Sequence, residues 1–478
     1  MTLDSLTCYR ALRARDARFD GRFFVAVSST RIYCRPVCSV KPPRRENCRF
    51  FPSAAAAEAA GYRPCLRCRP ELAPGNASVD ATSRLAQAAA GLIEDGALAE
   101  TRLDALAARL GVTDRHLRRA FAAEFGVAPV QFAQTQRLLL AKRLLTETAL
   151  PVTEIAFASG FGSVRRFNAL FRERYRMQPA RLRRMRAAGV ADVLEFELVF
   201  RPPYDWAAML DFLGAPAIAG VEQVEGGRYR RTVWLAADGK EHRGWIEVAL
   251  SAKRPALRVA VSASLARAVP AVLCRVKALM DLACQPLEVA QALGPLAAAR
   301  PGLRLPGAFD GFEVAVRAIL GQRISVAAAR TLAARFAGAF GEPVTTPFAS
   351  LGTLFPQASR VAGLRREHIA QLGVPAVRAQ AIVALARAVA AGELVLSPQA
   401  DAETTLAKLR QLPGVGEWTA QTIAMRALGW PDAFPHTDLG VMRSLGETDP
   451  RRVLAKAERW RPWRAYAVMH LWRSDRKE

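Results

Sequence analysis

The spacing of hydrophobic residues divides the chain into parts. Between residues 103 and 179, apolar residues recur every three to four positions, which is the period of an amphipathic helix. From about Val193 the period changes to two, and beyond about residue 295 the helical period returns. The alternating runs are rich in β-branched and aromatic residues, so they predict the strands of a small α+β unit: 194–200, 229–235, 244–250 and 256–261.

The first helical part is internally repeated. One unit covers residues 103–129, and a second covers 152–179. In each unit, apolar residues flank a short turn that holds Gly111 or Gly160, and the second turn has one extra residue. Two helices around such a turn are typical of a helix-turn-helix, so the sequence predicts two of these units. A cluster of Pro and Gly at 70–76 ends the segment that precedes them.

The charge of the chain favours a polyanionic partner. Its 478 residues carry a formal net charge of +25 and suffice for three or more domains. No aliphatic run is long enough to cross a bilayer, and the first residues do not form a signal peptide. We therefore expect the polyanion to be nucleic acid rather than a membrane surface.

Four cysteines in the N-terminal segment have the spacing of a metal site. They form a C-x3-C pair and a C-x2-C pair joined by a loop, which is the sequence form of a tetrahedral zinc site with four thiolates: Cys34, Cys38, Cys65 and Cys68. The other cysteines lack paired spacing and are expected to be reduced thiols outside the site: Cys8, Cys48, Cys274 and Cys284.

The sequence around these cysteines closely resembles the N-terminal domain of the Ada DNA-alkylation-response family. The resemblance covers residues 5–72 and is carried by 23–27, 32–38, 45–51 and 61–68. It implies that Cys34 takes a methyl group from a DNA phosphotriester, that the other three cysteines are plain ligands of one Zn²⁺, and that methylation acts as a switch. The alternative is an inert zinc knuckle.

The paired repeat resembles the AraC-type DNA-binding domain, over residues 78–186. The resemblance implies double-stranded promoter DNA and RNA polymerase as partners, with two recognition helices in successive major grooves. Arg176 stands where the family usually has Gly, and Leu182 where an aromatic residue is common. The arginines expected on the recognition helices, which could instead form a solvated face, are Arg115, Arg118, Arg119, Arg165 and Arg166.

The sharpest motif of the C-terminal half is Leu-Pro-Gly-Val-Gly at 412–416, followed after about twenty residues by Asp438. Two helices joined by such a turn form a helix-hairpin-helix, in which Gly414 and Gly416 let the backbone approach a DNA phosphate, often through a monovalent cation. With Asp438 at this distance, the pattern resembles the HhH-GPD superfamily of base-excision glycosylases.

Further segments narrow the resemblance to the 3-methyladenine DNA glycosylase II (AlkA) family over residues 193–475. They are 201–206, 300–307, 317–322 and 460–464. The resemblance implies an α+β domain at 193–295, a helical glycosylase domain at 296–475 and Asp438 as the catalytic carboxylate, although Asp438 could simply cap the next helix. Trp418 occupies the position of the Schiff-base lysine of strand-cutting relatives, so the resemblance implies a monofunctional glycosylase.

Three aromatic residues, Trp418, Trp472 and Phe212, match family pocket positions, although each could be a core residue instead. Aromatic faces suit a flipped cationic base. Thr422 stands where the family often has an aromatic residue, and Gln322 is followed by Arg323 where the family places a wedge. Arg323 could fill the gap left by a flipped base or bind phosphate.

These resemblances predict a multidomain α+β chain with a small zinc domain, an all-α double helix-turn-helix domain, a strand domain and an all-α glycosylase domain. We expect a monomer in the bacterial cytoplasm, associated with the nucleoid. The Pro-Cys-His-Arg motif of a second Ada methyltransferase is absent from the sequence. One rival is a regulator whose glycosylase half only grips DNA. Another is an enzyme whose front half delivers it to DNA without activating a promoter.

Overall fold

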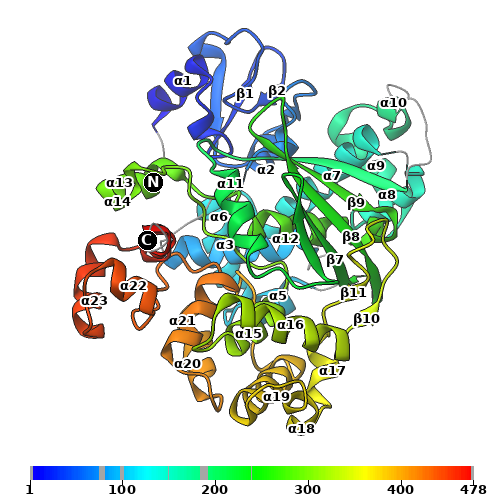
Figure 1. Ribbon diagram of the computed structural model, residues 1–478. Helices are drawn as coiled ribbons and strands as arrows, with labels where there is room; N and C mark the ends of the chain where they lie inside the picture. Colours follow the sequence, from blue (N-terminus) through cyan, green and yellow to red (C-terminus); the bar gives the residue numbers. More distant parts are fainter. Residues whose placement is uncertain are drawn as a thin grey trace.

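In a computed structural model, the chain folds into four parts that pack against one another (Figure 1). The structure describes residues 4–74, 81–96, 102–148, 150–183, 192–237 and 239–474. The predicted domain limits at 78, 186 and 475, and the last two residues of the Pro/Gly break, lie outside these residues.

The N-terminal part is a four-stranded sheet of order β3-β1-β2-β4 with short helices around it. Strands β1, β2 and β3 pair antiparallel, and β4 joins β2 in parallel. This pairing places the end of β2 beside the loop that follows β4. The elements are α1 (Ser5–Ala14), η1 (Ala17–Phe19), β1 (Phe24–Val27), β2 (Ile32–Cys34), η2 (Arg45–Asn47), β3 (Cys48–Phe51), α2 (Ala54–Ala59), β4 (Arg63–Pro64) and η3 (Pro70–Leu72).

The second part confirms the two predicted helix-turn-helix units. The turn of the first spans 110–113 and that of the second 159–163, so the extra residue is in the second turn. The first recognition helix ends at Gly126 with φ 73°, and the second ends at Arg176 with φ 56° in the same left-handed region. Its helices are α3 (Ala81–Glu94), α5 (Leu103–Arg109), α6 (Asp114–Phe125), α7 (Pro129–Glu147), α8 (Val152–Ala158), α9 (Val164–Tyr175) and α10 (Pro179–Arg183).

The third part is a five-stranded antiparallel sheet of order β5-β9-β8-β7-β6. Three of its long strands contain predicted runs in full, and β5 covers the run 194–200 except for its last residue. The short edge strand β6 was not predicted, because no alternating run covers it. The elements are β5 (Val193–Val199), α11 (Trp206–Gly214), β6 (Glu222–Glu225), β7 (Arg228–Ala237), β8 (Lys240–Leu250), β9 (Ala256–Ser262), η4 (Ala263–Ala268), α12 (Val269–Leu279), α13 (Pro286–Leu293) and α14 (Pro295–Ala298).

The C-terminal part is helical, as predicted, apart from the small β10–β11 ribbon. Its core holds much of the buried apolar surface of the described chain. The elements are α15 (Gly311–Leu320), α16 (Val326–Phe340), β10 (Glu342–Pro343), β11 (Thr353–Leu354), α17 (Ala358–Ala362), α18 (Arg366–Ala370), α19 (Ala376–Ala390), α20 (Ala402–Gln411), α21 (Glu417–Arg426), α22 (Leu439–Ser444), α23 (Pro450–Ala457), η5 (Glu458–Trp460) and α24 (Arg464–Ser474).

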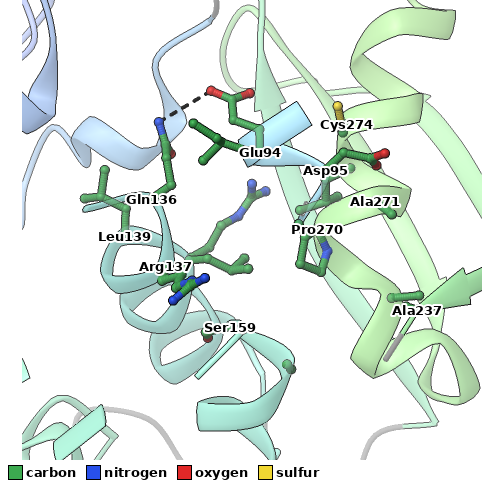
Figure 2. Close-up of a pocket in the computed structure, with 18 of the residues that line it drawn as sticks. Glu94, Asp95, Gln136, Arg137, Leu139, Ser159, Ala237, Pro270, Ala271 and Cys274 are labelled. Atoms are coloured by element: carbon green, nitrogen blue, oxygen red, sulfur yellow. Dashed lines mark hydrogen bonds between the residues drawn. The ribbon is translucent and has the colours of Figure 1, made fainter. Parts of the chain in front are cut away.

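The second helix-turn-helix unit and the five-stranded sheet share one hydrophobic core. Leu144 and Ile155 of the helical unit belong to the same buried cluster as Leu194 and Phe196 of β5. A cavity of about 130 Å³ lies at this junction, between α7 and α12. Figure 2 shows its lining, with the hydrogen bond from Gln136 to Glu94. The helical unit is therefore not an independent module.

The N-terminal part docks on α7 through a buried carboxylate. Glu58 on α2 accepts hydrogen bonds from Tyr33 (3.0 Å) and from Thr135 on α7 (3.0 Å). Nearby, a buried ion pair joins Lys142 of α7 to Glu71 (2.8 Å). Because breaking a buried ion pair leaves an uncompensated charge, these contacts fix one orientation of the two parts.

We expect Glu58→Gln to stabilise the protein at pH 8. Burial raises the pKa of the Glu58 carboxyl from 4.5 to about 7, against the hydrogen bonds from Thr135 and Tyr33, which lower it. The folded state therefore keeps a proton that the unfolded chain releases, so stability is highest below about pH 4.5 and falls as the pH rises to about 7. The loss is on the order of 3 kcal/mol.

Thermal unfolding at pH 5 and pH 8 measures this effect. Glu58→Gln is expected to flatten the pH dependence, since the amide is neutral at both values. Glu46→Gln, at an exposed glutamate of the same part, is the matched control and is expected to change little. A Glu58→Gln protein less stable than wild type at pH 8 would contradict the assignment of a raised pKa.

Candidate metal centre and candidate active site

The four cysteines predicted as metal ligands come together at one end of the N-terminal sheet. Cys34 ends β2, Cys38 lies in the following loop, and Cys65 and Cys68 follow β4. Their Sγ atoms all lie within 4.8 Å of one another. Four converging thiolates fit a tetrahedral zinc ion. Among the described residues, Cys48 lies outside this group, with its thiol near the carbonyl of Arg44 (3.3 Å).

The four sulfurs differ in access and in hydrogen bonding. Cys38 and Cys65 are buried, whereas Cys34 and Cys68 are half-buried. The backbone N–H of Arg35 donates to Cys68 Sγ (3.4 Å). An N–H donor withdraws charge from a thiolate, so of the two half-buried cysteines Cys68 has the less available electron pair.

Two cationic side chains, Arg35 and Lys142, contact backbone carbonyls of the cysteine group. The Arg35 guanidinium donates to the carbonyl of Cys68 (3.2 Å) and forms a buried ion pair with Asp20. Lys142 Nζ of α7 lies 3.4 Å from the carbonyl of Cys65. Arg201 of the sheet part donates to the carbonyl of Asp20 (2.8 Å). The group is thus tied by hydrogen bonds to both neighbouring parts.

The predicted recognition-helix arginines all lie at the surface. Those of the first unit are on α6 and those of the second on α9. Arg118 pairs with Asp114 one turn earlier at 3.3 Å, an exposed contact of small energy. Side chains of this kind remain available to an external polyanion. The exposed set is Arg115, Arg118, Arg119, Arg165 and Arg166.

The hairpin between α20 and α21 has the predicted turn. Gly414 has φ 77°, and a Cβ there would lie 3.2 Å from Val377, so the turn needs glycine. Gly416 is exposed and caps α21. Gln322 Nε2 donates to the carbonyl of Gly414 (2.9 Å) and to Thr419 Oγ1 (2.9 Å). The hairpin and the turn around Gln322 therefore form one surface.

Arg323 follows Gln322 on this surface. Its side chain is exposed, and its backbone has φ 53°, a left-handed conformation that costs a residue with a side chain on the order of 1 kcal/mol. Arg378 donates to the carbonyl of Gln322 and so holds the turn in place. Strained residues held by their surroundings are frequent at functional sites.

Asp438 caps α22 and also faces two tryptophans. Its Oδ1 accepts from the backbone N of Val441 (3.0 Å) and from Trp472 Nε1 (2.9 Å). Its Oδ2 accepts from Trp418 Nε1 (2.8 Å). The capping role and a site role coincide, because the cap uses only one oxygen. Three N–H donors fix the carboxylate in one orientation.

Phe212 of α11 completes the aromatic group. Its ring stacks on Trp472 with centroids 6.2 Å apart and an interplanar angle of 20°. The Arg426 guanidinium lies 4.7 Å from the Phe212 centroid, and burial lowers the pKa of Arg426 to about 10. The structure thus brings the three predicted aromatic residues and Asp438 together.

Two features of this group were not predicted from the sequence. Trp418 and Trp472 were predicted to offer aromatic faces to a base, whereas their indole N–H groups also donate hydrogen bonds to the Asp438 carboxylate. Arg426 was not predicted at all, although it lies eight residues after Trp418 and therefore on the same face of α21. That helical spacing was a usable signal.

Four family models match successive parts of the chain. They are the metal binding domain of Ada at residues 7–71, a helix-turn-helix domain at 106–185, the AlkA N-terminal domain at 195–310, and the HhH-GPD superfamily base excision DNA repair protein at 316–460. Their order is the order predicted from the sequence.

Individual relatives agree with this order. The "probable bifunctional transcriptional activator/DNA repair enzyme AlkA" of Mycobacterium tuberculosis is 39% identical, over 97% of this chain and 95% of that protein. DNA-3-methyladenine glycosylase 2 of Escherichia coli is also 39% identical, over 59% of this chain and 97% of that enzyme. The solved 3-methyladenine DNA-glycosylase of Archaeoglobus fulgidus shares the fold of this region, with a TM-score of 0.50, 23% identity, and coverage of 59% of this chain and 99% of that one.

Proposed function

The chain belongs to the family of bifunctional transcriptional activators and DNA repair glycosylases of the AlkA type, and from that membership we propose two reactions for it. The first is excision of 3-methyladenine and related alkylated bases from double-stranded DNA. The second is acceptance of a methyl group from DNA phosphotriesters. The observation that carries the proposal is the Asp438 carboxylate, held by Trp418 and Trp472 beside a stacked aromatic group.

The proposed excision needs little acid catalysis. An alkylated purine already carries positive charge, so the N-glycosidic bond breaks with its electron pair going to the base. Positive charge then develops on the sugar, and the Asp438 carboxylate stabilises that oxocarbenium ion and orients the attacking water. Because the indole donors hold the carboxylate before the reaction, little reorganisation is needed. Trp418 has no amine, so no Schiff base forms and the strand stays intact.

The aromatic group selects for a cationic base. We propose that Trp418, Trp472 and Phe212 contact the flipped base through their π faces, where stacking and cation–π attraction favour positive charge. The half-buried Arg426 lies against the Phe212 ring at the edge of this group.

DNA contacts come from two further surfaces. We propose that Gly414 and Gly416 grip a phosphate through a monovalent cation, and that Gln322 and Arg323 contact the DNA beside them. The recognition-helix arginines bind promoter DNA in successive major grooves, from which the protein contacts RNA polymerase. We further propose a monomer in the bacterial cytoplasm, associated with the nucleoid.

The methyl transfer is assigned to Cys34. A zinc ion bound to Cys34, Cys38, Cys65 and Cys68 would keep the four sulfurs deprotonated. The Cys34 sulfur then attacks the methyl carbon, an S–C bond forms, the C–O bond breaks, and the phosphodiester leaves with the electron pair. The product is a thioether, so the group loses one negative charge and repels the DNA backbone less. This change is the proposed activating switch.

Two measurements on the wild-type protein test the proposal. Incubation with methylated duplex is expected to release 3-methyladenine, seen by chromatography, without cutting the strand. Incubation with a phosphotriester-containing duplex is expected to add one methyl, which peptide mass spectrometry would locate on Cys34. Tight DNA binding with no base release would favour the regulator whose glycosylase half only grips DNA. Unchanged promoter affinity after methylation would favour the enzyme without a switch.

A further inference from the structure

Leu439 is an exposed leucine at the reacting end of the glycosylase part. It is the first residue of α22, directly after Asp438, and its exposed fraction is 70%. No other large hydrophobic residue in the described ranges is more exposed. Val441, two residues later, is fully buried and anchors the helix. Leu439 therefore faces solvent beside the carboxylate that must reach the sugar of the flipped nucleotide.

Hydrogen bonds connect this position to the turn around Arg323. Asp438 is bound to Trp418, the next residue Thr419 is bound to Gln322, and Arg323 follows Gln322. Leu439 and Arg323 lie at the two ends of this series. In Figure 1, α21 lies between α22 and α15, and α15 leads into the Arg323 turn. Both side chains are thus placed to meet DNA from the surface that holds Asp438.

The two side chains suit different parts of a duplex. The gap left by a flipped base is bounded by the apolar faces of neighbouring bases, and apolar wedges of this kind hold DNA steps open. Leu439 loses unfavourable contact with water when it enters such a gap. The Arg323 guanidinium would lose its hydration there, whereas beside the hairpin it can meet a phosphate.

We propose that Leu439 is the apolar plug that supports the flipped-out nucleotide, and that Arg323 contacts the phosphate backbone instead. This inference rests on the proposed glycosylase function. Leu439 is a positioning residue, because it acts on the DNA stack and not on the bond that breaks.

Comparing double-stranded with single-stranded substrate isolates the role of Leu439. A single strand has no intact stack to hold open, so it needs no plug. Leu439→Ala is expected to lower single-turnover base release from methylated duplex about 10- to 100-fold, and from a methylated single strand less than about 2-fold. Leu439→Met is expected to retain most of the duplex activity, since it keeps an apolar side chain of similar size. Leu287→Ala, at a leucine on α13 that is 43% exposed, is the matched control.

Arg323→Ala is expected to weaken binding to both substrates and to reduce the slope of log affinity against log salt by about one. A duplex-selective loss in Arg323→Ala, without one in Leu439→Ala, would reassign the plug to Arg323. An equal loss on both substrates in Leu439→Ala would show that Leu439 supports Asp438 rather than the stack, and would overturn the proposal. A wild-type protein that releases no base from either substrate would instead refute the proposed function.

Discussion

Asp438→Asn is expected to lower single-turnover release of 3-methyladenine by about 10³-fold or more, with DNA affinity nearly unchanged. The carboxylate charge acts mainly on the oxocarbenium ion, so its removal affects the transition state and not the bound ground state. The asparagine carbonyl can still accept from Val441, which preserves the cap of α22. The amide NH₂ of the asparagine would take the place of Oδ2 and face the indole N–H of Trp418. Because both groups are donors, the hydrogen bond from Trp418 is also lost.

Affinity for duplex that carries a stable abasic analogue separates catalysis from binding. Asp449→Asn is the matched control, because the Asp449 side chain also caps a helix, α23, and forms no hydrogen bond with Trp418 or Trp472 among the described residues. It is expected to release base at the wild-type rate. Should Asp438→Asn release base as fast as wild type, the assignment of Asp438 would be wrong.

Much of the fold follows from local patterns in the sequence. The C-x3-C and C-x2-C spacings predicted a group that the structure closes to within 4.8 Å. The period of two predicted β5, β7, β8 and β9, because each strand has one face in the core. The helix-turn-helix repeat was predictable to a single residue in its turns, because Gly111 and Gly160 both take the left-handed conformation there.

Contacts between the parts could not be predicted in this way. Glu58 and Thr135 lie 77 residues apart, and no periodicity relates them. The shared core of Leu144 and Phe196 arises from docking of two units that each have a regular pattern of their own. The same holds for the candidate active site. Trp418 and Trp472 were predicted as aromatic walls, but side-chain rotation, which spacing does not encode, turns their N–H groups toward Asp438.

The arrangement of the parts limits how a methyl group on Cys34 could act. The cysteine group is hydrogen-bonded to α7 through Lys142 and to the sheet part through Asp20 and Arg201. Tyr33, which precedes Cys34, donates a hydrogen bond to Glu58 at the interface with α7. A change in charge at the sulfurs would therefore alter the electrostatic potential close to α7, the helix that connects the two helix-turn-helix units.

Removing zinc with a chelator under reducing conditions is expected to unfold residues 4–74 while the remainder stays folded. The strands of this part are only two to four residues long, and its own buried clusters are small. Metal binding to four thiolates is typically worth about 10 kcal/mol or more, which exceeds what so small a core supplies. The glycosylase part has a large core, and the sheet part shares another with the second helix-turn-helix unit, so these parts are not expected to depend on the metal.

Three measurements follow the loss of metal. Elemental analysis is expected to give one zinc per chain before treatment, limited proteolysis is expected to cut within 4–74 after it, and base release from methylated duplex is expected to continue. Cys38→Ser is expected to behave like the chelated protein, because it removes a buried ligand. Cys48→Ser, outside the group, is expected to keep zinc and resist proteolysis. An unchanged proteolysis pattern in the chelated protein would show that the four cysteines do not hold a structural metal, because the domain would then be stable on its apolar core and its docking to α7 alone.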